Sequence, residues 1–402
     1  MRAVLIGGVA IRVVAALLLI AGPWTNEVAE LAGWDVARFQ EIAEAPGQPW
    51  VDHDVEYPPG SVLAIETIAQ DGVVQTHRIL VAVALGVDLG IAMLLALSSG
   101  RRAAGAYLLL GLPLIPAGLL RFDLLSVALA LIAAVALVGP TRREADPGAA
   151  DTTETRPGAF AVIVTAAALV KVWPALLVAG ALALGRRTAA LAAVMVMAIA
   201  GIAWLVYAGL SLDPIDQVVS LRGATGWHVE SLGGTITALT SDAQPERQLN
   251  AYRIGELNQM LVTAGRLLTV VIVAGLGWLV HRRGRSRPDL ELLALFMLGS
   301  VAALLVTAPL LSPQFLLWLT PWAAVVATGT GRGDRWADIS VALTAAATLV
   351  TGAVLAYYGP PNVAEPTPAA LLLARNVTLA ALVPATALAL LQPSTKKGAL
   401  KG

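Results

Sequence analysis

Residues 77–98 read HRILVAVALGVDLGIAMLLALS, a stretch in which Arg78 and Asp88 are the charged residues. A helix needs roughly 20 predominantly apolar residues to cross the hydrocarbon core of a bilayer. This stretch has that length and composition, so it predicts a transmembrane helix. Similar stretches recur along the whole chain, and they decide the fold.

Eleven further hydrophobic segments accompany this one. We place them at about 3–22, 103–120, 123–139, 159–170, 173–185, 188–208, 257–280, 289–309, 314–329, 336–357 and 369–392. Two of them, 159–170 and 173–185, are too short to span a membrane alone, and Lys171 and Pro174 separate them. We expect a hairpin of short or tilted helices there, or one broken pair. The pattern predicts an all-α polytopic membrane protein with about 12 transmembrane segments.

The composition excludes several classes of protein. Of the 402 residues, 57% are hydrophobic and 13% are charged, against about 45–50% and 25% in soluble domains. A soluble enzyme, a disordered chain and a nucleic-acid binder do not fit these values. The chain has no cysteine and four histidines, so it offers no thiolate metal site and no histidine-rich one. We expect no metal and no cofactor.

The basic residues indicate the orientation. Most of the 27 Lys and Arg residues lie in alternate connections, near residues 101, 142–156, 186, 282–287, 332–335 and 396–401. The positive-inside rule places these connections in the cytoplasm, so we expect a plasma-membrane protein with both termini cytoplasmic. The outer side then receives two long loops, at about 23–76 and 209–256. We expect residues 1–402 to form a single transmembrane domain, without a separate soluble domain, whose function lies on the outer face.

The first outer loop contains a short helix. Residues 31–45 (LAGWDVARFQEIAEA) are amphipathic, and we expect them to lie at the membrane interface. At 100° per residue, Asp35 shares the apolar face with Phe39 and Ile42. A carboxylate that loses its water is a stronger base, so Asp35 is a candidate general base. The alternative is an N-cap or a surface acid at the start of a helix.

An acidic segment, 51–60 (VDHDVEYPPG), follows this helix. Asp52, Asp54 and Glu56 alternate with other residues, so they can share one side of an extended chain. Two prolines after Tyr57 then fix the backbone. Clustered carboxylates can bind a divalent cation, but we favour an ordinary acidic turn before a helix.

The second outer loop combines groups suited to a phosphate or a sugar. Residues 220–232 (SLRGATGWHVESL) contain Arg222, Trp227, His228 and Glu230. A cation and an imidazole can contact phosphate or hydroxyl groups, and an indole ring offers an apolar face. The alternative is a set of residues that merely solvate a loop.

Several turns also bring polar groups to the outer face. They carry Arg121 and Asp123, then Lys171, and finally Gln314. Four further charged residues lie inside predicted spans, where charges are costly and usually face a partner or a cavity. These are Arg12, Asp88, Arg266 and Arg375. We consider structural pairing, for example of Asp88 with one of the arginines, as plausible as a functional role.

Taken in order, these motifs resemble those of a known family. The motifs are Trp34-Asp35, Glu56-Tyr57-Pro58-Pro59, Arg121-Phe122-Asp123, Lys171-Val172-Trp173-Pro174, residues 226–231 (GWHVES) and residues 312–318 (SPQFLLW). The chain resembles glycosyltransferase family 87, polyprenyl-phosphate-dependent mannosyl- and arabinofuranosyltransferases with the GT-C fold. The similarity runs from the first span to about residue 322. The composition, rich in Ala, Arg and Val, also fits an actinobacterial member.

The resemblance implies a reaction and a set of roles. A sugar passes from a polyprenyl monophosphate to an acceptor hydroxyl on the outer side, with inversion, and no metal is needed. Asp35 matches the family's first-loop acid and would be the general base, while His228 is a second candidate for handling a proton. The implied substrate-binding residues are Glu56, Tyr57, Arg121, Asp123, Lys171, Arg222, Trp227, Glu230 and Gln314. We expect mannose as the sugar, arabinofuranose as its rival, and a lipid-linked or small glycan acceptor.

Two other readings stay open. Twelve spans and intramembrane charges also fit a transporter or flippase for a lipid-linked sugar. However, no matching pair of broken helices is evident in the two halves of the sequence. A structural subunit of a cell-envelope assembly is the third reading, and it would not require an acid within the apolar face of an outer helix.

Overall fold

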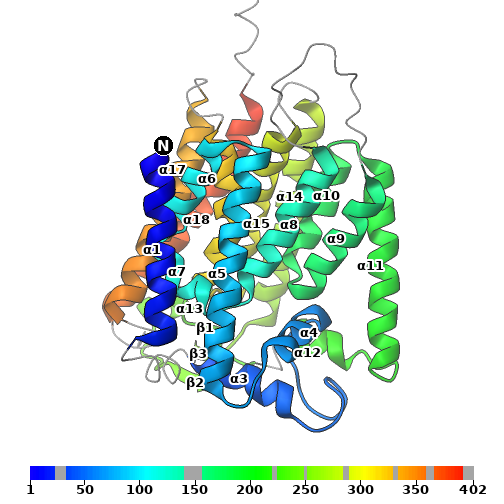
Figure 1. The fold of residues 1–402 in the computed structure, drawn as a ribbon, viewed down its shortest axis with the longest axis vertical. Helices are drawn as coiled ribbons and strands as arrows, with labels where there is room; N and C mark the ends of the chain where they lie inside the picture. Colours follow the sequence, from blue (N-terminus) through cyan, green and yellow to red (C-terminus); the bar gives the residue numbers. More distant parts are fainter. Residues whose placement is uncertain are drawn as a thin grey trace, which may run out of the picture.

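The chain forms a helical bundle in which each predicted hydrophobic segment is helical (Figure 1). The computed structural model describes residues 1–22, 33–139, 156–219, 224–248, 251–283, 289–328, 334–358 and 366–392. Within these ranges, seven helices are long and apolar enough to cross a membrane. They are α1 (Arg2–Ala21), α5 (Val73–Ser98), α11 (Arg187–Tyr207), α14 (Gln259–Arg283), α15 (Asp289–Thr307), α17 (Arg335–Tyr358) and α18 (Pro366–Leu391). The bundle is therefore that of an all-α polytopic membrane protein.

The other hydrophobic segments are bent or short. A bent pair, which could form an eighth span, joins α6 (Arg101–Leu110) to η1 (Leu112–Leu114) and α7 (Ile115–Leu119) with an angle of 46°. The shorter helices are α8 (Asp123–Val138), α9 (Pro157–Val170), η2 (Trp173–Ala175) with α10 (Leu176–Ala183), and η4 (Pro313–Trp318) with α16 (Thr320–Ala327). The predicted hairpin of short helices is confirmed, since α9 and α10 run in opposite directions from the break at Lys171 (Figure 1).

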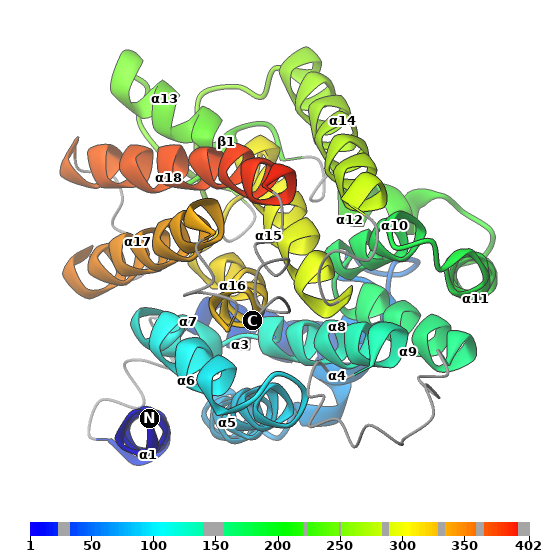
Figure 2. The same ribbon diagram turned by 90° about the horizontal axis from the view of Figure 1, so that it is seen from above.

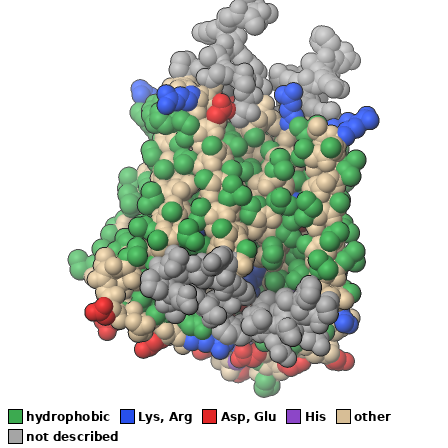
Figure 3. All heavy atoms as spheres, turned by 90° about the vertical axis from the view of Figure 1, so that its left-hand side faces the viewer, with side chains coloured by type: hydrophobic (Ala, Val, Ile, Leu, Met, Phe, Trp, Pro, Cys, Tyr) green, Lys and Arg blue, Asp and Glu red, His purple; other side chains and the backbone are tan. Residues whose placement is uncertain are grey.

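The two ends of the bundle differ in charge. Lys and Arg side chains gather at one end, most of the visible Asp and Glu side chains lie at the other, and hydrophobic side chains fill the band between them (Figure 3). Helix α1 begins, and α18 ends, at the end rich in Lys and Arg (Figure 1). We call this the basic end and the opposite end the loop end.

The loop end carries the short elements of the two long connections. They are α3 (Gly33–Glu44), α4 (Pro59–Ile68), α12 (Asp213–Val219), β1 (Trp227–His228), α13 (Leu232–Thr240), β2 (Glu246–Gln248) and β3 (Ala251–Ile254). The strands form an antiparallel sheet in the order β1-β3-β2, with His228 opposite Arg253. The sequence did not predict this sheet, because strands of two to four residues are too short to show an alternating pattern.

Burial divides the helices into central and peripheral ones. Helix α15 lies in the middle of the bundle (Figure 2) and is buried along most of its length. Helices α1, α11 and α14 lie at the periphery, and each keeps a large exposed apolar surface. Apolar side chains facing outwards are expected where lipid replaces water as the solvent.

One pair of charges inside the spans is satisfied within the bundle. The Arg12 guanidinium donates to Asp88 at 2.6 Å and to the Leu108 carbonyl at 3.0 Å. The hydroxyl of Tyr107 also donates to Asp88. Both charged side chains are buried, so this pairing ties α1 to α5 and α6. Of the two readings considered for Asp88, the structure shows the pairing with an arginine.

Candidate functional site

Helix α3 is seated on a small hydrophobic core at the loop end. Val36, Phe39 and Ile42 point into this core, and the ring of Phe39 lies 4.8 Å from that of Phe122. Phe122 follows Arg121 in the turn before α8. The contact between the two rings therefore brings the start of α3 next to that turn.

Asp35 and Arg121 form an ion pair across this contact. Their side chains are 23% and 25% exposed, so the pair is partly buried, and the Nη1 atom of Arg121 that faces Asp35 is itself buried. Asp35 lies one helical turn before Phe39 on α3, but it is only partly buried, whereas Phe39 and Ile42 are buried. Its carboxylate faces the guanidinium of Arg121 and is not surrounded by apolar side chains alone.

A second cation, Lys171, lies at the end of α9. Helix α4 approaches this end closely: the Ser61 hydroxyl donates to the Val170 carbonyl at 2.6 Å, and a Cβ on Gly60 would stand 2.8 Å from the backbone of Leu169. This approach places Tyr57, which precedes α4, beside Lys171. The two prolines predicted to stiffen this segment act here, since Pro59 begins α4.

Aromatic rings flank the ammonium group of Lys171. Its Nζ lies 5.2 Å from the centroid of Tyr57 and 5.9 Å from that of Phe315. In the described part of the chain, no carboxylate lies within 4.0 Å of this ammonium. Tyr57 also contacts Phe39, with ring centroids 5.8 Å apart. The rings of Tyr57, Phe39 and Phe122 therefore connect Lys171 to the turn that carries Arg121. We treat Lys171 and the Asp35–Arg121 pair as one cluster.

An aromatic stack continues from Phe315 into the bundle. The ring of Trp318 lies 4.4 Å from Phe315 and 5.4 Å from Trp173. The indole of Trp318 donates to Asp123 at 2.8 Å, so the buried Asp123 carboxylate is bound to protein. Gln314, on the same 3-10 helix as Phe315, is 8% exposed. The stack holds η4 against the start of α8, and only its outer ring is partly exposed.

Glu56 is held by a residue that the sequence analysis missed. Arg38, five residues after the start of α3, donates to both carboxylate oxygens of Glu56, at 2.9 and 3.3 Å. Arg38 also pairs with Glu41 at 2.8 Å and donates to the Asp54 carbonyl. The spacing of Arg38 and Glu41, three residues apart on a helix, was the available signal. This geometry favours a structural role for Glu56.

His228 and Trp227 are also engaged inside the protein. The His228 Nδ1 accepts from the backbone nitrogen of Glu230 at 3.3 Å. Burial, with the nearby charges of Arg253 and Arg375, lowers the pKa of His228 to about 3. An imidazole of this pKa stays neutral at pH 7 and is a weak base. The ring of Trp227 packs on Gly233, where a Cβ would stand 2.6 Å from it. Both residues hold β1 against α13.

Glu230 connects the second long loop, at the loop end, to α18. Its carboxylate accepts from Arg375 at 2.7 Å. Burial raises the pKa of Glu230, and the charges of Arg375 and Arg121 oppose that rise. Burial likewise lowers the pKa of Arg121 to about 10, against the opposing charges of Asp123 and Glu230. Glu230 is thus close enough to Arg121 for their charges to interact.

The predicted site residues therefore fall into two groups. The structure brings together Asp35, Arg121, Lys171 and Tyr57 as partly accessible groups at the loop end. It binds the side chains of Glu56, Asp123, His228 and Glu230 to other parts of the protein. Arg222 lies outside the described residues. Among those described, no three His, Asp or Glu side chains are arranged to hold a metal ion.

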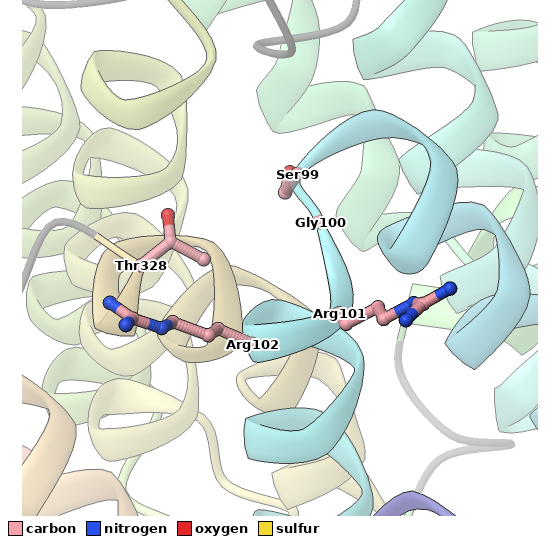
Figure 4. Close-up of a pocket in the computed structure, with 5 residues that line it drawn as sticks. All are labelled: Ser99, Gly100, Arg101, Arg102 and Thr328. Atoms are coloured by element: carbon pink, nitrogen blue, oxygen red, sulfur yellow. The ribbon is translucent and has the colours of Figure 1, made fainter. Parts of the chain in front are cut away.

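A cavity of about 430 Å³ opens at the other end of the bundle. It is lined by Ser99, Gly100, Arg101, Arg102 and Thr328 (Figure 4). Arg102 extends toward Thr328, and Arg101 points away from it (Figure 4). This cavity contains no acid or base for proton transfer at neutral pH. We therefore take the cluster around Asp35 as the candidate site.

The fold and the site define a class but no family. The chain is a polytopic helical membrane protein with a polar, partly accessible cluster at its loop end. No family model matches the sequence, and a search of curated proteins finds no match. The function is therefore argued from the cluster itself.

Proposed function

We propose that this chain is a membrane glycosyltransferase that takes a sugar from a polyprenyl monophosphate. The observation that carries the proposal is the pairing of Asp35 with Arg121 beside Lys171. A carboxylate and two cations are the groups that this transfer needs. The carboxylate accepts a proton, and the cations stabilise the leaving phosphate. The resemblance of the motifs to glycosyltransferase family 87 supports the same conclusion.

In the proposed step, an acceptor hydroxyl attacks the anomeric carbon of the sugar. The bond between that carbon and the phosphate oxygen breaks as the new glycosidic bond forms, which inverts the anomeric centre. Asp35 accepts the hydroxyl proton, and the polyprenyl phosphate leaves with the bonding electrons. The donor phosphate competes with Asp35 for Arg121, so donor binding frees the carboxylate to act as a base. Lys171 stabilises the charge that grows on the phosphate.

The proposal includes an arrangement in the membrane. All twelve hydrophobic segments cross or enter the bilayer in a GT-C-like bundle, with both termini cytoplasmic and the loop end outside. Helix α3 lies at the outer interface. The prenyl chain of the donor lies among lipid-facing helices, and the acceptor is lipid-linked or a small glycan. Mannose is the expected sugar, and neither a cofactor nor a metal takes part.

Radiolabelled sugar transfer from synthetic polyprenyl-phosphate-mannose tests the proposal. Wild type, Asp35→Asn and Asp71→Asn are compared in membranes at matched expression. Asp71 is an exposed acid in the same loop, so it controls for the chemical change. We expect Asp35→Asn to reduce transfer by about 10²–10⁴-fold and Asp71→Asn to leave it within a factor of two.

Each other result has a definite meaning. Full transfer by Asp35→Asn would remove Asp35 as the base. If the wild type transfers sugar from neither the mannose nor the arabinofuranose donor, the proposal that the chain is a glycosyltransferase is contradicted. The alternative, a flippase for a lipid-linked sugar, would then be measured as movement of the labelled lipid across vesicles that contain the protein.

A further inference from the structure

Arg375 binds both the side chain and the backbone of one residue, Glu230, in the second long loop. It is fully buried on α18. Its Nη1 donates to the Glu230 carboxylate at 2.7 Å, and its Nη2 donates to the Glu230 backbone oxygen at 2.5 Å. The neighbouring Asn376 donates to the same backbone oxygen at 3.1 Å and to Thr235 at 3.2 Å. Both the backbone and the side chain of Glu230 are therefore held by α18.

Glu230 in turn stands near the cation of the candidate site. Its carboxylate stabilises the charge of Arg121, as does Asp123. Asp123 is already bound to the indole of Trp318, while Arg121 forms its ion pair with Asp35. Charges of alternating sign thus run from Arg375 through Glu230 and Arg121 to Asp35. Four separate parts of the chain contribute to this line.

Stability alone does not account for Arg375. A buried ion pair is often no more stabilising than apolar side chains of the same volume, and α18 is otherwise a helix of apolar and small residues. However, removing only the arginine would leave Glu230 buried without its counter-ion. The positive charge of Arg121 also acts on Glu230, so Arg121 would then be drawn from Asp35 toward the unpaired carboxylate.

We infer that Arg375 is a positioning residue: by binding Glu230 through side chain and backbone, it leaves the guanidinium of Arg121 to Asp35. Arg375 touches neither Asp35 nor Arg121 directly. Its effect on sugar transfer rests on the proposed function, but its effect on the surroundings of Asp35 does not. The two can therefore be measured separately.

The absence of cysteine from the sequence allows a clean measurement. In Asp35→Cys, the thiol is the single cysteine of the chain, and its alkylation rate reports the fraction of thiolate. A neighbouring guanidinium lowers the pKa of a thiol. Alkylation by iodoacetamide is measured as a function of pH in the purified full-length protein, with no donor present.

The expected pattern requires three further variants on the Asp35→Cys background. Arg375→Gln slows alkylation at pH 7 by about tenfold, because Arg121 moves toward Glu230 and the thiol pKa rises by about one unit. Adding Glu230→Gln to Arg375→Gln restores the original rate, because the carboxylate released by the loss of Arg375 is then removed, while Asp123 stays bound to Trp318 as in the wild type. Arg12→Gln, which removes the other fully buried arginine, leaves the thiol titration unchanged and controls for general destabilisation.

Unchanged alkylation in folded Arg375→Gln would overturn the inference, as would failure of the double variant to restore the rate. If Arg375→Gln does not fold, Arg375→Lys is measured instead. It keeps the charge but loses the two-point geometry, and a titration identical to that of Asp35→Cys alone would overturn the inference.

Transfer is then assayed in proteins that retain Asp35. A thiol shift without transfer by wild type would count against the proposed function only. Transfer by wild type without a thiol shift would count against Arg375 only.

Discussion

The ion pairs Arg12–Asp88 and Arg121–Asp35 join the same chemical groups in opposite surroundings. The first lies inside the bundle with side chains 1% and 8% exposed, and Tyr107 and backbone carbonyls take up its remaining hydrogen bonds. The second lies at the loop end, where both side chains are about one quarter exposed. The first pair is sealed from solvent, whereas the second is partly exposed; we refer to these as the sealed and the open pair.

This difference separates structural charges from functional ones. A sealed pair has no free position at which a substrate could bind, so it contributes to the bundle alone. An open pair can exchange one partner for an incoming anion at modest cost, since water already screens part of the attraction. Glu230 with Arg375, and Glu56 with Arg38, stand nearer the sealed class. Lys171, flanked by rings rather than carboxylates, stands nearer the open class.

The largest expected effect on stability comes from removing one partner of the sealed Arg12–Asp88 pair. Asp88→Asn or Arg12→Leu alone should lower the free energy of unfolding by about 3–5 kcal/mol, because each leaves a buried charge without its partner. The combined change Arg12→Met, Asp88→Leu and Tyr107→Phe should recover most of that loss. Thermal unfolding in detergent measures both. A single variant that is as stable as wild type would show that this pair is not sealed.

A smaller effect on stability is expected at low pH, because of the protonation of His228. Its folded pKa of about 3 lies below the ordinary value near 6.5, so between these values the unfolded state binds a proton that the folded state does not. Stability should therefore fall as the pH drops from 6.5 toward 3, by at most about 1.4 kcal/mol per pH unit. His228→Gln should remove this part of the slope. The check is the unfolding midpoint at pH 7, 6 and 5, and equal slopes in the two proteins would contradict a sealed His228.

The sequence predicted the local features of this molecule well. The lengths and compositions of the hydrophobic segments were sufficient to find the helices, including the short hairpin broken at Lys171. The helical wheel placed Phe39 and Ile42 on the inward face of α3, and both are buried there. A carboxylate inside a span implied a cation, and Arg12 supplies it for Asp88.

The partners across the loop end could not be predicted. Asp35 pairs with Arg121, Glu56 with Arg38, and Glu230 with Arg375, and two of these three pairs join distant parts of the chain. The two long-range pairs depend on how the long loops pack against the bundle, and hydropathy carries no information on that packing. The sequence therefore indicated the kinds of residues in the site but not which of them are engaged by the protein itself.

The smallest expected effect concerns Glu56, which the motif suggested as a substrate ligand and the structure binds to Arg38. Glu56→Gln should lower the free energy of unfolding by about 1–2 kcal/mol, since a hydrogen bond between charged groups weakens. Arg38 keeps Glu41 and the Asp54 carbonyl as partners, so α3 stays in place and kcat/KM for transfer should change less than about threefold. Glu41→Gln is the matched control, because it removes the exposed partner of the same arginine and should cost under about 1 kcal/mol. A hundredfold loss of kcat/KM in Glu56→Gln at unchanged stability would move Glu56 from the sealed group to the open one.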